Sequence, residues 1–164
     1  MLRKKWFVQL IVLSFVFSFY TIGTVHANGD SVLLETKKAA SNGHVINSEF
    51  GVNSQKGKIK KAYGTPDSED ESILDYYPSR QVAFQLNKNK VEMVYSASKE
   101  YQGLTSEDVE KQLGKPHCAE GGFGKAYWSY HLGKYLLTFQ FVNEEVKTLQ
   151  QVLVEKNRTC NELN

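Results

Sequence analysis

The 164-residue chain is close to electrical neutrality, with 20 Lys and Arg against 18 Asp and Glu. This balance excludes a protein that nucleic acid attracts as a whole body, because such attraction depends on an excess of positive charge. The length suits a single domain, since a chain of this size can bury roughly two thirds of its unfolded surface around one core.

The first 27 residues have the pattern of a secretory signal peptide. Three basic residues precede a mostly apolar run that begins at Trp6, and the segment ends in VHA, with small residues where a signal peptidase reads them. We therefore expect residues 1–27 to be removed and residues 28–164 to be exported as one domain. An uncleaved anchor is the alternative, because residues 6–25 are numerous enough to span a bilayer, and only in that case would the protein be held at a membrane.

Two amphipathic helices are expected in the first half of the chain. The first covers about residues 31–40 and places Val32 and Leu33 on its apolar side. The second covers the phrase KGKIKKAYGTP, where Asn53 or Ser54 can cap the start and the Gly-x-Pro triplet ends the helix. A glycine in its first turn weakens this helix by up to about 1 kcal/mol relative to alanine.

The phrase GLTSEDVEKQLGKP, fifty residues later, predicts the helix with the clearest start and stop signals. Thr105 is a good N-cap, and Asp108 three places on completes a capping-box pattern. Val109 and Leu113 present one apolar stripe to a core. A glycine and a proline then end the helix, as they do in the earlier phrase. The residues of this shared signature are Gly64, Pro66, Gly114 and Pro116.

Runs of strand-forming residues follow each Gly-x-Pro and are separated by turn-type breaks. They lie around Tyr76 and at residues 82–86, 91–96, 126–131, 135–142 and 146–154. We therefore expect an α+β fold of two tandem repeats, about residues 44–98 and 99–155, followed by a tail at 156–164. Each repeat would be a helix plus a three-stranded antiparallel meander, with the helices packed on one face of the sheet. The alternative is that the two segments are unrelated and merely share common turn signals.

These residues resemble known families. The stretches GLT and LG, Pro116 and then WSY are similar to the outer-membrane assembly lipoproteins called SmpA or BamE. The same unit resembles each half of the β-lactamase inhibitor protein. The chain after the leader, with YGTPD, LDYYPSRQVAFQL and KVEMVYS, looks most like the YjgB-like proteins, which are secreted by Gram-positive bacteria and have no assigned function. The resemblance implies a β-lactamase-inhibitor-like fold, a Gram-positive cell surface and no known catalytic residues.

Cys118 and Cys160 are the two cysteines of the chain. Export favours a disulfide between them, which would close a loop of about forty residues and contribute roughly 4 kcal/mol in the chain-entropy model. The alternative is a metal site that includes His117, but such a site has too few candidate ligands. We therefore expect a disulfide, no metal and no other cofactor.

No constellation of side chains predicts catalysis, so we do not expect an enzyme. His44 lies in a polar loop and His131 at a turn, where solvation accounts for both. An acidic loop at residues 67–75 could hold calcium but lacks the spacing of an EF-hand. Lysines at residues 56–61 could meet an anionic wall polymer. For the acidic loop the simpler explanation is a solvated loop, and for the lysines it is an exposed helix face. An enzyme that uses surface carboxylates is the least favoured of the functions considered.

Aromatic side chains on the strands suggest a function. Alternation puts Tyr127 and Trp128 on opposite faces, and helices cover only one face of such a sheet. Large aromatics on the open face are typical of binding surfaces, although cross-strand packing explains them equally well. We predict a secreted or cell-envelope, non-catalytic domain that binds a protein or a wall component and no nucleic acid. The open face is expected to carry some of Tyr76, Tyr95, Trp128 and Tyr130. The alternative is a small-molecule or lipid-binding module with a cavity between helices and sheet.

Overall fold

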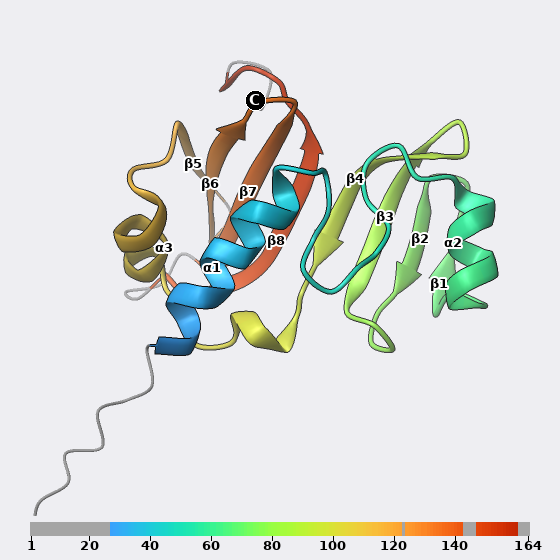
Figure 1. Cartoon of the computed structure of the whole chain (residues 1–164), viewed down its shortest axis with the longest axis horizontal. Helices are drawn as coiled ribbons and strands as arrows, with labels where there is room; N and C mark the ends of the chain where they lie inside the picture. The colour runs from blue at the N-terminus through green and yellow to red at the C-terminus, as the bar shows by residue number, and fades with distance from the viewer. Residues whose placement is uncertain (1–26, 123, 143–146, 161–164) are drawn as a thin grey trace, which may run out of the picture.

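Eight strands form one antiparallel sheet in the computed structural model, which describes residues 27–122, 124–142 and 147–160 (Figure 1). The strand order is β1-β2-β3-β4-β8-β7-β6-β5. β4 is the last strand of the first half of the chain and β8 is the last of the second half, and these two strands pair at the centre of the sheet. The strands are β1 (Ser68–Glu69), β2 (Ile73–Tyr76), β3 (Val82–Asn87), β4 (Lys90–Ser96), β5 (Cys118–Gly122), β6 (Lys125–Leu132), β7 (Tyr135–Val142) and β8 (Leu149–Lys156).

Three α-helices and one 3-10 helix complete the described part of the chain. They are α1 (Ala27–Ala40), α2 (Lys56–Tyr63), α3 (Ser106–Leu113) and η1 (Lys99–Tyr101). The capping box predicted for α3 is confirmed, because Thr105 Oγ1 accepts from Asp108 N at 3.3 Å and Asp108 Oδ2 accepts from Thr105 N at 2.8 Å. The predicted cap of α2 is wrong. Its N-cap is Gln55, and Lys56 N donates to the carbonyl of Asn89 in the β3–β4 turn.

The predicted pair of tandem repeats, each a helix plus a three-stranded meander, is wrong. One continuous eight-stranded sheet with three helices takes its place, so residues 44–98 and 99–155 are not repeats of that kind. The prediction missed β1 and β5, one at each edge of the sheet. β1 has only two residues and β5 contains two glycines, so neither carries the β-branched run that marks a strand. The α+β class is correct.

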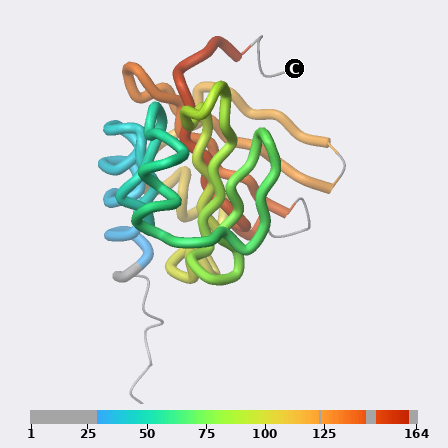
Figure 2. Tube along the Cα trace, turned by 90° about the vertical axis from the view of Figure 1, so that its right-hand side faces the viewer, coloured from blue at the N-terminus to red at the C-terminus, as the bar shows by residue number. Residues whose placement is uncertain are grey.

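Helices cover one face of the sheet. Figure 2 shows α1 and α2 on the same side of the strands, and α1 also contacts α3 and β7. Side chains on the helix side are buried at every second position, as with Val82, Phe84 and Leu86 of β3. Leu33 of α1 and Ile59 of α2 complete this core and are fully buried. Burial of each such side chain contributes roughly 1.5–3 kcal/mol, which fixes the helices to the sheet.

No helix among the described residues is long and apolar enough to cross a membrane. The predicted signal peptide falls outside the described residues except for Ala27, which is the first residue of α1. The helix predicted at residues 31–40 is present as α1, which begins four residues earlier than expected.

Candidate functional site

The face of the sheet away from the helices, here called the open face, carries a row of side chains that crosses seven strands. The cross-strand register aligns Asp75, Ala83, Tyr95, Leu153, Thr138, Ser129 and Cys118, from β2 to β5. The row mixes small, aromatic, aliphatic and hydroxyl side chains. It is therefore neither a second apolar core nor a uniformly charged surface.

A hollow of about 400 Å³ lies on the open face over β2, β3 and β4. We call it the tyrosine hollow. Its lining residues are Ile73, Asp75, Tyr77, Gln81, Val82, Ala83, Tyr95, Ala97 and Gln151. Tyr77 is 57% exposed and Ile73 is 40% exposed. Among the described residues, the other large hydrophobic side chain with comparable exposure is Leu34, which lies on α1. The hollow thus gathers exposed apolar surface that the fold does not bury.

Hydrogen bonds hold the lining of the tyrosine hollow in place. Asp75 Oδ1 accepts from the backbone N of Tyr77 at 2.9 Å, which fixes the turn that presents the Tyr77 ring. The hydroxyl of Tyr95 donates to Gln85 Oε1 at 2.8 Å. Burial, with a smaller effect from the charge of Glu155, raises the pKa of Tyr95, so its hydroxyl keeps its proton to a higher pH than a solvated tyrosine does.

The rim of the hollow is built around Gln81. Its side-chain oxygen accepts from Lys99 N at 3.1 Å, and its carbonyl accepts from Ala97 N at 3.0 Å. These bonds join the start of β3 to the segment after β4. A rim that is already ordered loses little conformational entropy when a ligand binds.

A second, smaller hollow of about 200 Å³ lies nearer the centre of the open face. Leu153, which faces Tyr95 across the β4–β8 pairing, is part of its lining. Glu155 is buried there and accepts from Arg158 Nη2 at 2.9 Å. Burial raises the pKa of Glu155, while the hydrogen bond from Arg158 acts in the opposite direction. This carboxyl group is paired, so its first role is to anchor the segment after β8.

Of the four predicted contact residues, Tyr95 alone lies on the open face. Tyr76 and Tyr130 are 1% and 4% exposed and face the helices, so their expected availability to a partner is corrected. Trp128 is half-buried on the same side and packs edge-on against Phe141, with ring centroids 5.3 Å apart. The predicted alternation between Tyr127 and Trp128 is correct, but the sequence does not reveal which face the helices cover.

Sequence reasoning missed Ile73 and Tyr77 as site residues. The signal was present in the alternation around Tyr76. Once Tyr76 faces the core, alternation places Ile73 on the opposite side, and Tyr77 is the first residue after the strand. What was lacking was the assignment of Tyr76 itself, which depends on contacts with a helix ten or more residues earlier.

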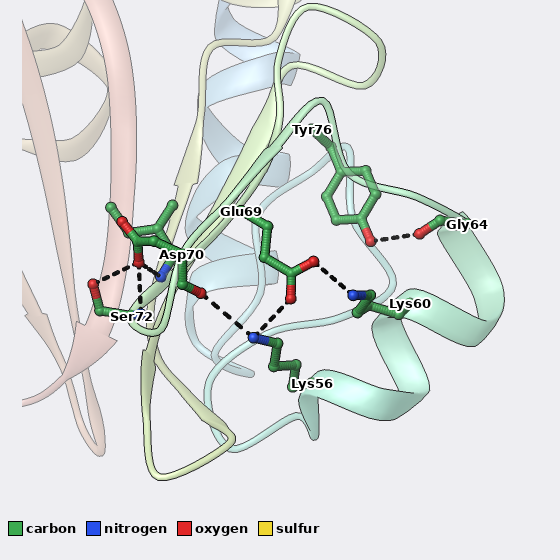
Figure 3. A network of polar contacts seen from close by, with 8 residues as sticks. Lys56, Lys60, Gly64, Glu69, Asp70, Ser72 and Tyr76 are labelled. Atoms are coloured by element: carbon green, nitrogen blue, oxygen red, sulfur yellow. Dashed lines mark hydrogen bonds and ion pairs between the residues drawn. The ribbon is translucent and has the colours of Figure 1, made fainter.

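The acidic loop is joined to α2 by ion pairs between Glu69 and two lysines of the helix. Glu69 contacts Lys56 Nζ at 2.8 Å and Lys60 Nζ at 2.6 Å (Figure 3). These two hydrogen bonds lower the pKa of Glu69. Asp70 Oδ1 accepts from the backbone N of Ser72 and of Ile73, and the Ser72 bond is the main reason that the pKa of Asp70 is lowered. These contacts attach β1 to α2 and order the turn into β2.

The predicted disulfide between Cys118 and Cys160 is present, with Cα atoms 5.7 Å apart. It joins β5 to the segment that follows β8. His131 lies beside it, with Nε2 3.8 Å from Cys118 Sγ, and the His117 ring lies 5.2 Å from the His131 ring. The sequence prediction did not place His131 near either cysteine, because β5 was not recognised as a strand paired with β6.

Comparison with known proteins identifies relatives without an assigned activity. Residues 33–154 match the domain of unknown function DUF4309. The structure is similar to the crystal structure of a DUF4309 family protein, YjgB, from Bacillus subtilis subsp. subtilis str. 168, with a TM-score of 0.68. The two chains are 17% identical, and the similarity covers 80% of this chain and 99% of that chain. No curated protein matches. The resemblance to YjgB-like proteins is confirmed, whereas repeats like those of the β-lactamase inhibitor or the assembly lipoproteins find no support.

Proposed function

We propose that this chain, which belongs to the DUF4309 family of domains of unknown function, is a non-catalytic binding domain that works outside the cytoplasm. Its ligand is another protein or a component of the cell wall, and its contact surface is the tyrosine hollow. The observation that carries the proposal is the joint exposure of Tyr77 and Ile73 at one ordered hollow on the open face.

The chemistry of the hollow favours a ligand with both apolar and polar parts. Binding is favoured when a partner covers water-exposed apolar side chains, because removing apolar surface from water lowers the free energy. A concentration of such side chains in one place is typical of interaction sites. Tyrosine is enriched among the residues that dominate binding energy at interfaces. Asp75, Gln81 and Gln151 add polar groups around the apolar centre, and such groups orient a ligand.

Two features support a location outside the cytoplasm. The N-terminal residues have the basic, apolar and small-residue pattern of a secretory leader. The disulfide between Cys118 and Cys160 is of the kind that persists in oxidising surroundings. A Gram-positive cell surface is the compartment that agrees with both features and with the YjgB resemblance.

The alternative of a small molecule or lipid between the helices and the sheet receives less support. Core side chains of that layer, such as Phe84, Ile59 and Leu33, are fully buried in one cluster. A ligand there would have to displace packed core side chains, and such rearrangement is costly in a close-packed interior.

The test compares the double variant Ile73→Ser/Tyr77→Ser with Leu34→Ser, which removes an equally exposed apolar side chain from α1. Purified peptidoglycan is one probe, measured by co-sedimentation. The other is chemical cross-linking on intact cells, with the attached protein identified by mass spectrometry. We expect the double variant to lose binding roughly tenfold or more, since two truncated contact residues each cost about 1 kcal/mol or more. Retention of wild-type binding by the double variant, or an equal loss in Leu34→Ser, contradicts the proposal.

A further inference from the structure

The disulfide has a histidine neighbour that the proposed binding function does not use. Cys118 of β5 pairs with Ser129 of β6, and His131 lies two residues beyond Ser129 on the same face. Diagonal neighbours of this kind come within reach of each other on a sheet. The ligand atoms of Cys118, His131 and Cys160 all lie within 4.8 Å of one another.

We infer that these three residues bind a zinc ion when the disulfide is reduced. Tetrahedral zinc holds sulfur at about 2.3 Å and imidazole nitrogen at about 2.0–2.1 Å, which places two such ligand atoms about 3.6 Å apart. Cys118 Sγ and His131 Nε2 are already 3.8 Å apart. Reduction therefore requires only that Cys160 Sγ move away from Cys118 Sγ to complete three corners of the tetrahedron.

His131 is held in the tautomer that a metal ligand needs. Its Nδ1 is hydrogen-bonded to Asn157 Oδ1. The amide orientation of Asn157 follows from its own bond, because Nδ2 donates to the Gly133 carbonyl at 2.8 Å. An amide oxygen can only accept, so His131 Nδ1 carries the proton and Nε2 keeps its lone pair toward Cys118. Partners of this kind orient the histidines of established metal sites.

The segment that carries Cys160 is fastened beside the site independently of the disulfide. Asn157 N donates to the Lys134 carbonyl at 2.9 Å, and Arg158 contacts Glu155 at 2.9 Å. Both bonds remain when the sulfur atoms separate. The Cys160 thiol therefore stays near Cys118 and His131 in the reduced chain.

The fourth coordination position is open to water or an added ligand. His117 is close, but its Nδ1 accepts from the backbone N of His131 at 3.3 Å. That bond aims the lone pair of His117 at the backbone and leaves three protein ligands, two thiolates and one imidazole. Zinc sites with three protein ligands and one open position are well established.

The chemistry balances with a dithiol as the reductant. The dithiol supplies two electrons and two protons to the Cys118–Cys160 bond and becomes a disulfide, leaving two protein thiols. Zinc then replaces the two thiol protons, which pass to solvent. In the reverse step a disulfide oxidant accepts two electrons from the two thiolates and two protons from solvent and becomes a dithiol, the Cys118–Cys160 bond forms again, and the zinc ion is released. The segment after β8 is thus joined to β5 by a covalent bond in one state and by a metal in the other.

The test uses the full chain, reduced with a phosphine, and titrates it with Co²⁺ and then with Zn²⁺. We expect one Co²⁺ per chain with thiolate-to-cobalt absorption, displaced by Zn²⁺, and no such absorption from the oxidised chain. His131→Ala should lower the affinity by at least about tenfold, and Asn157→Ala by roughly ten- to a hundredfold. His117→Ala and His44→Ala serve as matched controls and should bind as the wild type does.

Several outcomes overturn the inference. They are a folded, reduced chain without thiolate-to-cobalt absorption, a His131→Ala variant with wild-type affinity, or a loss in His117→Ala that equals the loss in His131→Ala. Circular dichroism records whether the reduced chain stays folded. If reduction unfolds it, refolding by Zn²⁺ supports the site, and failure of Zn²⁺ to refold it counts against the site.

Discussion

The hydroxyl of Tyr130 on β6 donates a hydrogen bond to the backbone carbonyl of Gly114, 2.9 Å away at the end of α3. Tyr76 on β2 makes the corresponding contact with the Gly64 carbonyl at the end of α2, at 3.0 Å. Carbonyl groups at the end of a helix lack partners within it, and a buried tyrosine needs a partner for its hydroxyl. Each bond satisfies both needs and ties one helix to the sheet.

Replacing Tyr130 with Phe removes this bond while keeping the buried ring. We expect the free energy of unfolding to fall by about 1 kcal/mol, the usual net contribution of one such hydrogen bond. Urea unfolding measures the change. The control is Tyr127→Phe. Tyr127 is half-buried on the open face of the same strand, so this change should leave stability nearly unchanged. Equal losses in the two variants would show that the Gly114 contact contributes nothing particular.

The two short helices differ at their N-caps, which allows a matched comparison. Thr105 caps α3 through a complete capping box, whereas Gln55 makes no side-chain cap bond at α2. Thr105→Ala should therefore destabilise the protein by about 1 kcal/mol, and Gln55→Ala by only a few tenths. Chemical denaturation of both variants gives the comparison. The reverse order of effects would contradict the caps described above.

Replacing glycine with alanine should have opposite effects on protein stability at two positions. Gly57 lies in the first turn of α2 with open space where a Cβ would stand, so Gly57→Ala should stabilise the protein by roughly 0.5–1 kcal/mol. A Cβ on Gly51 would lie 2.0 Å from the Gly43 carbonyl oxygen, so the backbone must move and Gly51→Ala should destabilise. Thermal unfolding separates the two. A Gly51→Ala protein that melts at the wild-type temperature would disprove the close approach.

Alkaline pH should weaken the fold through Tyr101. Burial raises the pKa of Tyr101 to about 12 from an ordinary value of 10.0. Between these values the unfolded chain loses the proton while the folded chain keeps it, so the free energy of unfolding decreases as pH rises from about 10 to 12. In Tyr101→Phe this decrease should be smaller, although the loss of the contact with Thr36 lowers stability equally at all pH values. Identical slopes in both proteins would contradict the burial effect.

Removal of the disulfide should cost more than any single side-chain change discussed above. The two cysteines are 42 residues apart, and closing a loop of that length contributes about 4 kcal/mol in the chain-entropy model. Cys118→Ser/Cys160→Ser should lower the free energy of unfolding by roughly 2–4 kcal/mol in urea, with a chelator present to exclude metal. A loss below about 1 kcal/mol would mean that the segment after β8 is held chiefly by Asn157 and Arg158.

How much the sequence predicts depends on whether the signal is local. The limits of α3 follow from Thr105, Asp108 and Gly114, because caps act within one turn of the helix. Strand β5, with its Gly121 and Gly122, has little intrinsic preference and forms because β6 offers an edge to pair with. The pairing is local, with Gly122 opposite Lys125, but a segment that ends in two glycines has no run of β-branched or aromatic residues to mark it as a strand. Leaving β5 out gives the incorrect three-stranded repeats.

The candidate site shows the same division. Alternation correctly separates Tyr127 from Trp128, since it needs only the geometry of one strand. The choice between core and open face depends on where α2 and α3 pack. For this reason the sequence pattern predicts Tyr76 and Tyr130 as contact residues, whereas in the structure they bond the carbonyl groups at the ends of α2 and α3. The proximity of Cys118 to His131 likewise needs the register between two strands.

The meeting of β4 with β8 at the centre of the sheet has a consequence for biosynthesis. A ribosome completes β4 more than fifty residues before it reaches the end of β8, the strand that pairs with β4 on that side. Throughout that interval the nascent chain presents the unpaired backbone of Met93 to Ser96, an edge that other strands can join. Delivery of an unfinished chain to an export channel or a chaperone, before its own final strand is made, would shield that edge from neighbouring chains.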